Sequence, residues 1–220
     1  MLQKIKPQST GLIVLFFMLA TDVAFIAVHL LHCFHKKLGE ASPLLLDTGY
    51  GYPESFQFLK YTIILILLGT FIAKKKWFSF IPLLFLFILL FLDDVLQWHR
   101  LFGNAMYQFF HLEGRWSFSG ANLGYMLYTV VLGIFCLLLI LIGVQKSSKR
   151  LKGYYRIIFF LLSALFLFGF GVDVLNQAIS YHYGKFCFFT VIEEGGEMIV
   201  LSLLVWYIVG IGNDSRTDEK

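Results

Sequence analysis

The chain has 220 residues, of which 58% are hydrophobic and 15% are charged, and its mean hydropathy is +0.75. Soluble domains carry about 25% charged residues, so this composition excludes a water-soluble globular protein and predicts that lipid is the solvent. The net charge of +4 does not indicate nucleic-acid binding, because the lysines and arginines lie between apolar runs, where membrane topology accounts for them.

Six apolar runs follow one another along the chain, and each is long enough to cross a bilayer, which takes roughly 20 residues. They cover residues 11–34, 56–73, 77–98, 121–144, 155–180 and 190–212. The first follows two lysines, as a signal peptide does, but it is too long for one and no small-residue cleavage site follows. Lys60, near one end of the second run, is expected to extend its ammonium group to the interface. We therefore predict an all-α fold, with a single bundle of six transmembrane helices across residues 1–220.

Two of the segments between these runs are distinctive. Residues 37–55 are rich in Gly, Pro and Tyr, which indicates turns close to the interface. Residues 100–120 contain LFGNAMYQFFHL, whose aromatic side chains predict a segment at headgroup depth that covers one face of the bundle.

The distribution of lysine and arginine predicts that both ends of the chain are cytoplasmic. With that orientation the inner segments hold Lys4, Lys6, Lys74, Lys75, Lys76, Lys146, Lys149, Arg150, Lys152, Arg156, Arg216 and Lys220. The outer segments hold Lys36, Lys37, Lys60, Arg100, Arg115 and Lys185. Cys33 and Cys187 then lie on the same outer side, and a disulfide between them is one pairing that the topology allows.

Seven acidic residues lie inside the apolar runs or at their edges. They are Asp22, Asp93, Asp94, Asp173, Glu193, Glu194 and Glu197. An ionised side chain at the bilayer centre costs at least about 2.5–3.5 kcal/mol, so such residues usually face the bundle interior and serve a function. In the predicted topology the acids of the first, third, fifth and sixth runs lie at similar depth in the outer half.

Helical spacing places several of these groups on common faces. Asp22 is seven residues before His29 and ten before His32, and Glu193 is four before Glu197, so each set shares one helix face. His99 lies well around the helix from Asp94 and joins the acids only if that helix end turns or unwinds. Converging carboxylates and imidazoles are ligands for zinc, iron or manganese. The strict Glu-x-x-His spacing of bundled di-metal proteins is absent.

Two segments resemble signatures of uncharacterised bacterial multi-pass membrane proteins. FLDDVLQWHR matches an acidic pair followed after four residues by histidine, and VIEEGGEMIVL matches Glu-Glu-x-x-Glu-Met. The matching residues are Asp93, Asp94, His99, Glu193, Glu194, Glu197 and Met198. Arg100 follows the histidine where the signature has an acid. The resemblance implies a multi-pass protein of the bacterial inner membrane and carries over no activity.

The sequence therefore predicts a metal site in the extracytoplasmic half, able to support hydrolysis of a lipid or a small periplasmic molecule. Its expected ligands are His29, His32, Asp93, Asp94, His99, Asp173, Glu194 and Glu197, with Glu193, Glu194, Glu197 and Asp94 as catalytic residues. Three alternatives stay open. The acids form structural ion pairs with Arg100, Arg115 or Lys185; they carry protons or cations in a transporter; or they dock a partner of an accessory subunit.

Overall fold

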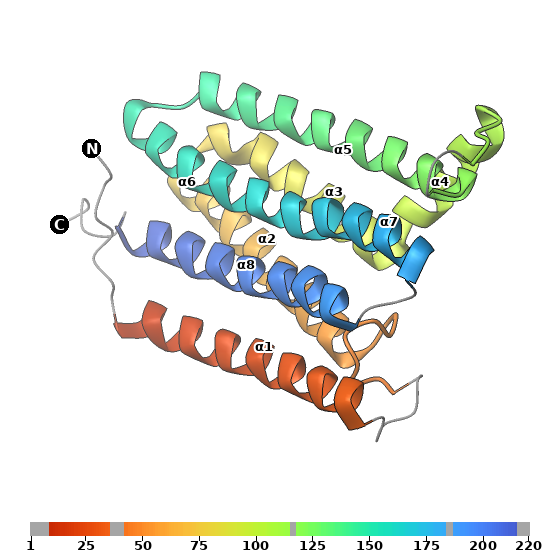
Figure 1. The fold of residues 1–220 in the computed structure, drawn as a ribbon. Coiled ribbons are helices and arrows are strands. Elements are labelled where there is room, and N and C mark those ends of the chain that lie inside the picture. Colours follow the sequence, from red (N-terminus) through yellow and green to blue (C-terminus); the bar gives the residue numbers. More distant parts are fainter. Residues whose placement is uncertain (1–8, 36–41, 115–117, 184–186, 215–220) are drawn as a thin grey trace.

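Six membrane-length helices form one bundle in the described part of the computed structural model, which confirms the predicted all-α fold (Figure 1). The structure describes residues 9–35, 42–114, 118–183 and 187–214. The described chain starts and finishes at one end of the bundle, here called the terminal end (Figure 1). Cys33 and Cys187 lie at the opposite end, here called the disulfide end.

The helix bounds extend or divide several of the predicted runs. The helices are α1 (Ser9–His35), α2 (Tyr52–Lys75), α3 (Ile81–Leu96), α4 (Trp98–Phe109), α5 (Gly120–Gln145), α6 (Lys149–Phe166), α7 (Asp173–Tyr183) and α8 (Cys187–Asp214). A 3-10 turn, η1 (Phe78–Phe80), precedes α3, and a π-helical segment, η2 (Leu167–Val172), joins α6 to α7 within the fifth span.

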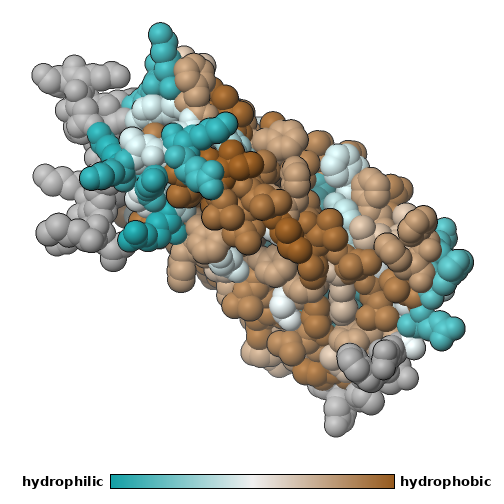
Figure 2. Space-filling view, turned by 90° about the horizontal axis from the view of Figure 1, so that it is seen from above, coloured by the Kyte–Doolittle hydropathy of each residue, from teal (hydrophilic) through white to brown (hydrophobic). Residues whose placement is uncertain are grey.

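Apolar side chains cover the middle of the molecule, while polar residues collect at its two ends (Figure 2). Large apolar side chains such as Phe16, Phe17 and Phe160 are exposed, as suits helices that contact lipid. The chain is thus a multi-pass membrane protein in contact with a lipid bilayer.

The core is centred on α8, which packs against α1, α2 and α6. Leu201, Leu204 and Ile208 of α8 are fully buried, together with Leu68 of α2 and Ile158 of α6. By contrast, α5 lies at the edge of the bundle and is exposed along much of its length (Figure 1). The apolar core fills the half towards the terminal end, and the polar residues described below occupy the other half.

Helix α4 corresponds to the segment predicted at headgroup depth, and it packs closely on the first turns of α5. Two glycines permit this approach. A Cβ on Gly103 would lie 2.9 Å from the Tyr125 Cα, and a Cβ on Gly124 would overlap the Gly103 carbonyl oxygen. Both contacts involve backbone atoms, which cannot move aside as a flexible side chain can.

We expect Gly124→Ala to separate α4 from α5 and to lower the stability of the protein in detergent by about 1–3 kcal/mol, the usual cost of overpacking. Gly69→Ala is the matched control, because a Cβ on Gly69 meets nothing within 4 Å. Thermal unfolding followed by circular dichroism measures both variants. Equal midpoints for the two would show that this helix contact does not contribute to stability.

Lys60 does not reach the interface, so the prediction made for it was wrong. Helix α2 begins at Tyr52, with Pro53 in its first turn, and this places Lys60 two turns inside the helix. Its ammonium group is fully buried and lies 2.5 Å from Asp22 Oδ1, and it also donates to the Met198 carbonyl oxygen at 2.9 Å. The Ser202 hydroxyl donates to Asp22 Oδ2 at 2.6 Å. This network joins α1, α2 and α8 deep within the bundle.

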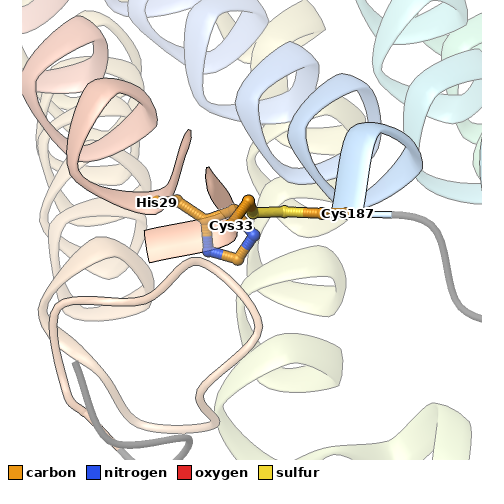
Figure 3. A group of neighbouring side chains, drawn as sticks. All are labelled: His29, Cys33 and Cys187. Carbon is orange, nitrogen blue, oxygen red and sulfur yellow. A yellow bond between two sulfur atoms is a disulfide. The ribbon is translucent and has the colours of Figure 1, made fainter. Parts of the chain in front are cut away.

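A disulfide between Cys33 and Cys187 joins the last turn of α1 to the start of α8, with His29 beside it (Figure 3). The two Cα atoms lie 6.2 Å apart, and the bridge closes a sequence separation of 154 residues. Helix α1 is therefore attached to α8 at two depths, by this bridge and by the Asp22 network.

Replacing both cysteines, as Cys33→Ser/Cys187→Ser, should lower the free energy of unfolding by about 2–5 kcal/mol, because the unfolded chain regains the freedom that a long closed loop removes. The measurement is a denaturation curve in mixed micelles. Cys136→Ser is the control, since Cys136 is a free thiol. A double variant as stable as Cys136→Ser would contradict this expectation.

Candidate functional site

A cavity of about 1030 Å³ is lined by every helix from α2 to α8, together with η2, and extends towards the disulfide end. Eight acidic residues line it: Asp47, Glu54, Asp93, Asp94, Asp173, Glu193, Glu194 and Glu197. We call the part that holds Asp93, Asp94, Asp173, Glu193, Glu194 and Glu197 the carboxylate chamber. Among the residues that the structure describes, the basic side chains that line the cavity are His99 and Arg100. The carboxylates in this wall therefore far outnumber the cationic groups.

A break between α3 and α4 brings His99 to the chamber. Gln97 adopts a left-handed conformation, with φ of 50°, so the chain turns immediately after α3 and α4 begins at Trp98. His99 Nδ1 then lies 3.5 Å from Asp93 Oδ2, and its ring stands edge-on to Tyr125 at 5.6 Å between centroids. The end of α3 therefore turns, which is the condition under which His99 was expected to join the acids.

The π-helical segment η2 makes room for Glu197. A Cβ on Gly169 would overlap the Glu197 Oε1 atom, so the carboxylate lies directly against the backbone of η2. On α8, a Cβ on Gly196 would overlap the ring of Phe168, also in η2. Segments of π-helix occur frequently at functional sites, because the extra residue displaces the helix face. Here the glycines let α8 and η2 approach around an acidic side chain.

Neighbouring polar groups hold several chamber acids in place. The Tyr128 hydroxyl donates to Asp93 Oδ1 at 2.8 Å, and Gln177 Nε2 donates to Asp173 Oδ2 at 2.7 Å. Two more of the acids have polar neighbours, since Tyr61 is within hydrogen-bonding reach of Asp94, and Asn176 of Glu193. Hydrogen bonds of this kind orient a carboxylate but do not cancel its charge.

The chamber acids interact with one another through their charges. Glu197 has electrostatic contacts with Glu194, Asp94, Glu193 and Asp173, and Glu194 has them with Glu193 and Asp94. Like charges repel strongly where little water screens them. Protons or a bound cation must therefore neutralise part of this charge.

The structure brings seven of the predicted site residues to the cavity and leaves two elsewhere. Asp93, Asp94, His99, Asp173, Glu193, Glu194 and Glu197 all line it. His29 and His32 of α1 do not, and Asp22 lies in the Lys60 network. His29 is buried, and its Nδ1 atom accepts a hydrogen bond from the Leu46 N–H at 3.2 Å. This nitrogen therefore carries no proton. It cannot donate to Asp47 Oδ1, which lies 3.9 Å away.

The structural ion-pair alternative finds little support from Arg100. Its guanidinium donates to Gln97 Oε1 at 3.3 Å, and within the described residues it forms no ion pair with a chamber acid. The other two cations in that alternative, Arg115 and Lys185, lie outside the described residues.

Sequence reasoning missed the contribution of α2 and the loop before it. Glu54, Gln57 and Tyr61 line the cavity from α2, and Asp47 and Gly49 line it from the loop. The steps of three and four residues from Glu54 to Gln57 to Tyr61 place these side chains on one helix face. This spacing could have been recognised in the sequence. It was overlooked because the apolar run starts only at Phe56, which leaves Glu54 in the preceding loop.

Within the described residues, three possible metal-ligand atoms lie within 4.8 Å of one another at one place: His29, Cys33 and Cys187. Two of these are the sulfurs of the disulfide (Figure 3), which offer no thiolate to a metal. The donor atoms of the carboxylate chamber are more widely spaced. A cation held there would have to keep some of its water.

The chain belongs to a family described as a domain of unknown function, DUF8692, whose model matches residues 55–211. The match contains all six acids of the carboxylate chamber and most of α2, and it leaves out α1. Comparison with curated proteins and with solved structures yields no match.

Proposed function

We propose that this protein binds a divalent metal ion in the carboxylate chamber and uses it to hold a ligand at the membrane surface. The observation that carries the proposal is the collection of Asp93, Asp94, Asp173, Glu193, Glu194 and Glu197 around one cavity, with His99 beside them. So many carboxylates around one cavity of a membrane-spanning bundle are costly to keep ionised. A bound cation supplies the compensating charge.

The chemistry of the chamber favours a hard, partly hydrated cation. Carboxylate oxygens with one imidazole suit manganese better than zinc, which prefers a compact site of nitrogen and sulfur ligands. Wide spacing of the donors also fits an ion that keeps several waters. Of zinc, iron and manganese, we therefore propose manganese.

Isothermal titration calorimetry of Mn²⁺ into the metal-free protein in detergent tests this proposal. We expect one ion per chain for the wild type and a loss of about 100-fold or more in affinity for Glu194→Gln and Asp94→Asn, comparable to losing several kcal/mol of charge pairing. Gly169→Ala should also weaken binding, because its Cβ displaces Glu197. Gly171→Ala is the matched control in the same segment, where a Cβ meets only the flexible end of Leu167.

Other outcomes would favour the competing functions. Proton flux in vesicles without Mn²⁺ binding would indicate a transporter, although away from the acids the cavity is lined by apolar residues such as Leu86, Ile140 and Phe159. Loss of assembly with a partner, again without Mn²⁺ binding, would indicate an accessory subunit. Either result would overturn the metal proposal.

Two independent features support an orientation with the chamber on the extracytoplasmic side. Lysines and arginines are concentrated at the terminal end, as expected of a cytoplasmic face. The Cys33–Cys187 disulfide lies at the other end, and disulfides persist in oxidising compartments outside the cytoplasm. We propose a location in the cell membrane, specifically the bacterial inner membrane.

Hydrolysis of a lipid or small periplasmic molecule is the reaction that this arrangement would support. A bound metal ion would supply a more acidic water, and a neighbouring carboxylate of this chain would accept the proton which that water loses. Glu193, Glu194, Glu197 and Asp94 are the candidates for that carboxylate.

A further inference from the structure

The cavity continues well beyond the acids, between α5 and α6. Its lining along α5 runs from Ala121 to Ile140. At 1.5 Å per residue this is a length of roughly 28 Å, close to the thickness of the hydrocarbon core of a bilayer. We call its inner part, lined by Leu86, Leu137, Ile140, Phe159, Leu162 and Leu165, the apolar arm. One end of the cavity is thus acidic, and the other is suited to hydrocarbon.

The apolar arm has an edge that faces lipid. Val130, Ile134 and Leu137 line the cavity and are also exposed, at 41%, 55% and 41%, and their spacing of four and three residues places them in one row along α5. Phe159 and Phe166 do the same on α6, with exposures of 44% and 43%. These two rows of side chains border a slot between α5 and α6. The ring of Phe166 lies against Gly133 and crosses this slot.

Other elements contribute walls at the disulfide end. Leu45 and Leu46 anchor the loop before α2 by burying their side chains, and Asp47 and Gly49 of that loop line the cavity. The Tyr50 hydroxyl donates to the Val95 carbonyl of α3 at 3.2 Å, which ties the same loop to the bundle. A ligand with a long apolar tail would therefore enter more directly from the bilayer than from water.

From this geometry we infer that the ligand is a single-chain amphiphile that enters sideways from the bilayer through the slot between α5 and α6. Its tail occupies the apolar arm, and its anionic head reaches the carboxylate chamber. The placement of the head rests on the proposed function, because anionic oxygens can approach these acids only through the metal ion. The placement of the tail rests on the cavity alone.

The test uses the full-length protein in vesicles of phosphatidylethanolamine and phosphatidylglycerol, with a palmitoyl lysophospholipid that carries a photoactivatable diazirine near the end of its chain. After illumination, mass spectrometry maps the labelled residues. We expect labelling at Cys136, Ile140 and Leu162, which line the cavity, to exceed labelling at Phe16 and Phe17, which are exposed on α1. Labelling spread evenly over all lipid-facing residues would overturn the inference.

Neighbouring tryptophan variants provide a matched comparison. Leu137→Trp should block the slot and reduce labelling of Ile140 by about tenfold or more. The control is Leu138→Trp, because Leu138 is 51% exposed but does not line the cavity. This control should leave the labelling of Ile140 unchanged. Ile134→Trp and Phe135→Trp form a second pair of the same kind. Equal labelling within both pairs would overturn the sideways entry.

Calorimetry with Mn²⁺ separates this inference from the proposed function. If Mn²⁺ binds but labelling is evenly spread, the tail site is wrong and the metal site stands. If labelling depends on the slot but Mn²⁺ does not bind, the tail site stands and the placement of the head is wrong.

Discussion

Asp22→Asn should lower the free energy of unfolding by about 3–5 kcal/mol, because it leaves the Lys60 ammonium group buried without its counter-ion. Both side chains are fully buried and 2.5 Å apart, so water cannot replace the lost partner. Lys60→Met should cost a similar amount by leaving the Asp22 carboxylate unpaired. Denaturation with SDS in mixed micelles, followed by tryptophan fluorescence, measures these differences.

The double variant Asp22→Leu/Lys60→Met distinguishes the effect of breaking the ion pair from the effect of disturbing the packing at this site. Replacing both members of a buried ion pair by apolar residues is often close to neutral, so we expect the double variant to be within about 1 kcal/mol of the wild type. Glu113→Gln, at an exposed acid in the segment after α4, controls for the loss of one negative charge. Single variants no less stable than this control would show that the pair contributes nothing.

Neutralising the carboxylate chamber should have the opposite effect on the metal-free protein. We expect Glu194→Gln/Glu197→Gln to raise the free energy of unfolding in EDTA by about 1–3 kcal/mol, because it removes part of the cost of ionised acids in the membrane, which is at least about 2.5–3.5 kcal/mol for one acid at the bilayer centre. Binding sites commonly reduce stability in this way, since they hold groups in positions that suit a ligand and not the fold.

Saturation with Mn²⁺ should reverse that order. At a concentration 100 times the dissociation constant, a bound ion stabilises the wild type by about 2.7 kcal/mol, and the double variant should gain nothing. The same SDS titration, with EDTA and then with Mn²⁺, gives both numbers. A double variant less stable than the wild type in EDTA would mean that these glutamates hold the fold together.

The periodicity of the sequence predicted the six helices and placed the chamber acids at one level, because the length and composition of each run depend on the bilayer alone. It did not predict the partners of individual side chains. Lys60 was misplaced because Tyr52, Pro53, Glu54 and Ser55 make a polar first turn that hydropathy assigns to the loop. The position of His99 depends on the left-handed conformation of Gln97. Residues other than glycine seldom adopt this conformation, so nothing in the sequence indicates a turn at Gln97.

The arrangement of helices within the bundle was harder still to infer. His29 and Asp22 share a face of α1, as the spacing predicted, yet α1 packs on α8 and its polar face meets Lys60 and Leu46 instead of the other acids. Helical spacing indicates which residues share a face but not which neighbour that face meets. The π-helical segment around Gly169, which admits Glu197, likewise depends on tertiary packing.

The two attachments of α1 also constrain the order in which the chain matures. Helix α1 carries Asp22, whose partner Lys60 follows 38 residues later, while Cys187 follows Cys33 by 154 residues. At about 5–20 residues per second, a ribosome needs roughly 8–30 s to synthesise that interval. Cys33 therefore stays a free thiol until Cys187 of α8 has been made, so the disulfide can form only after the Asp22–Lys60 pair is already available.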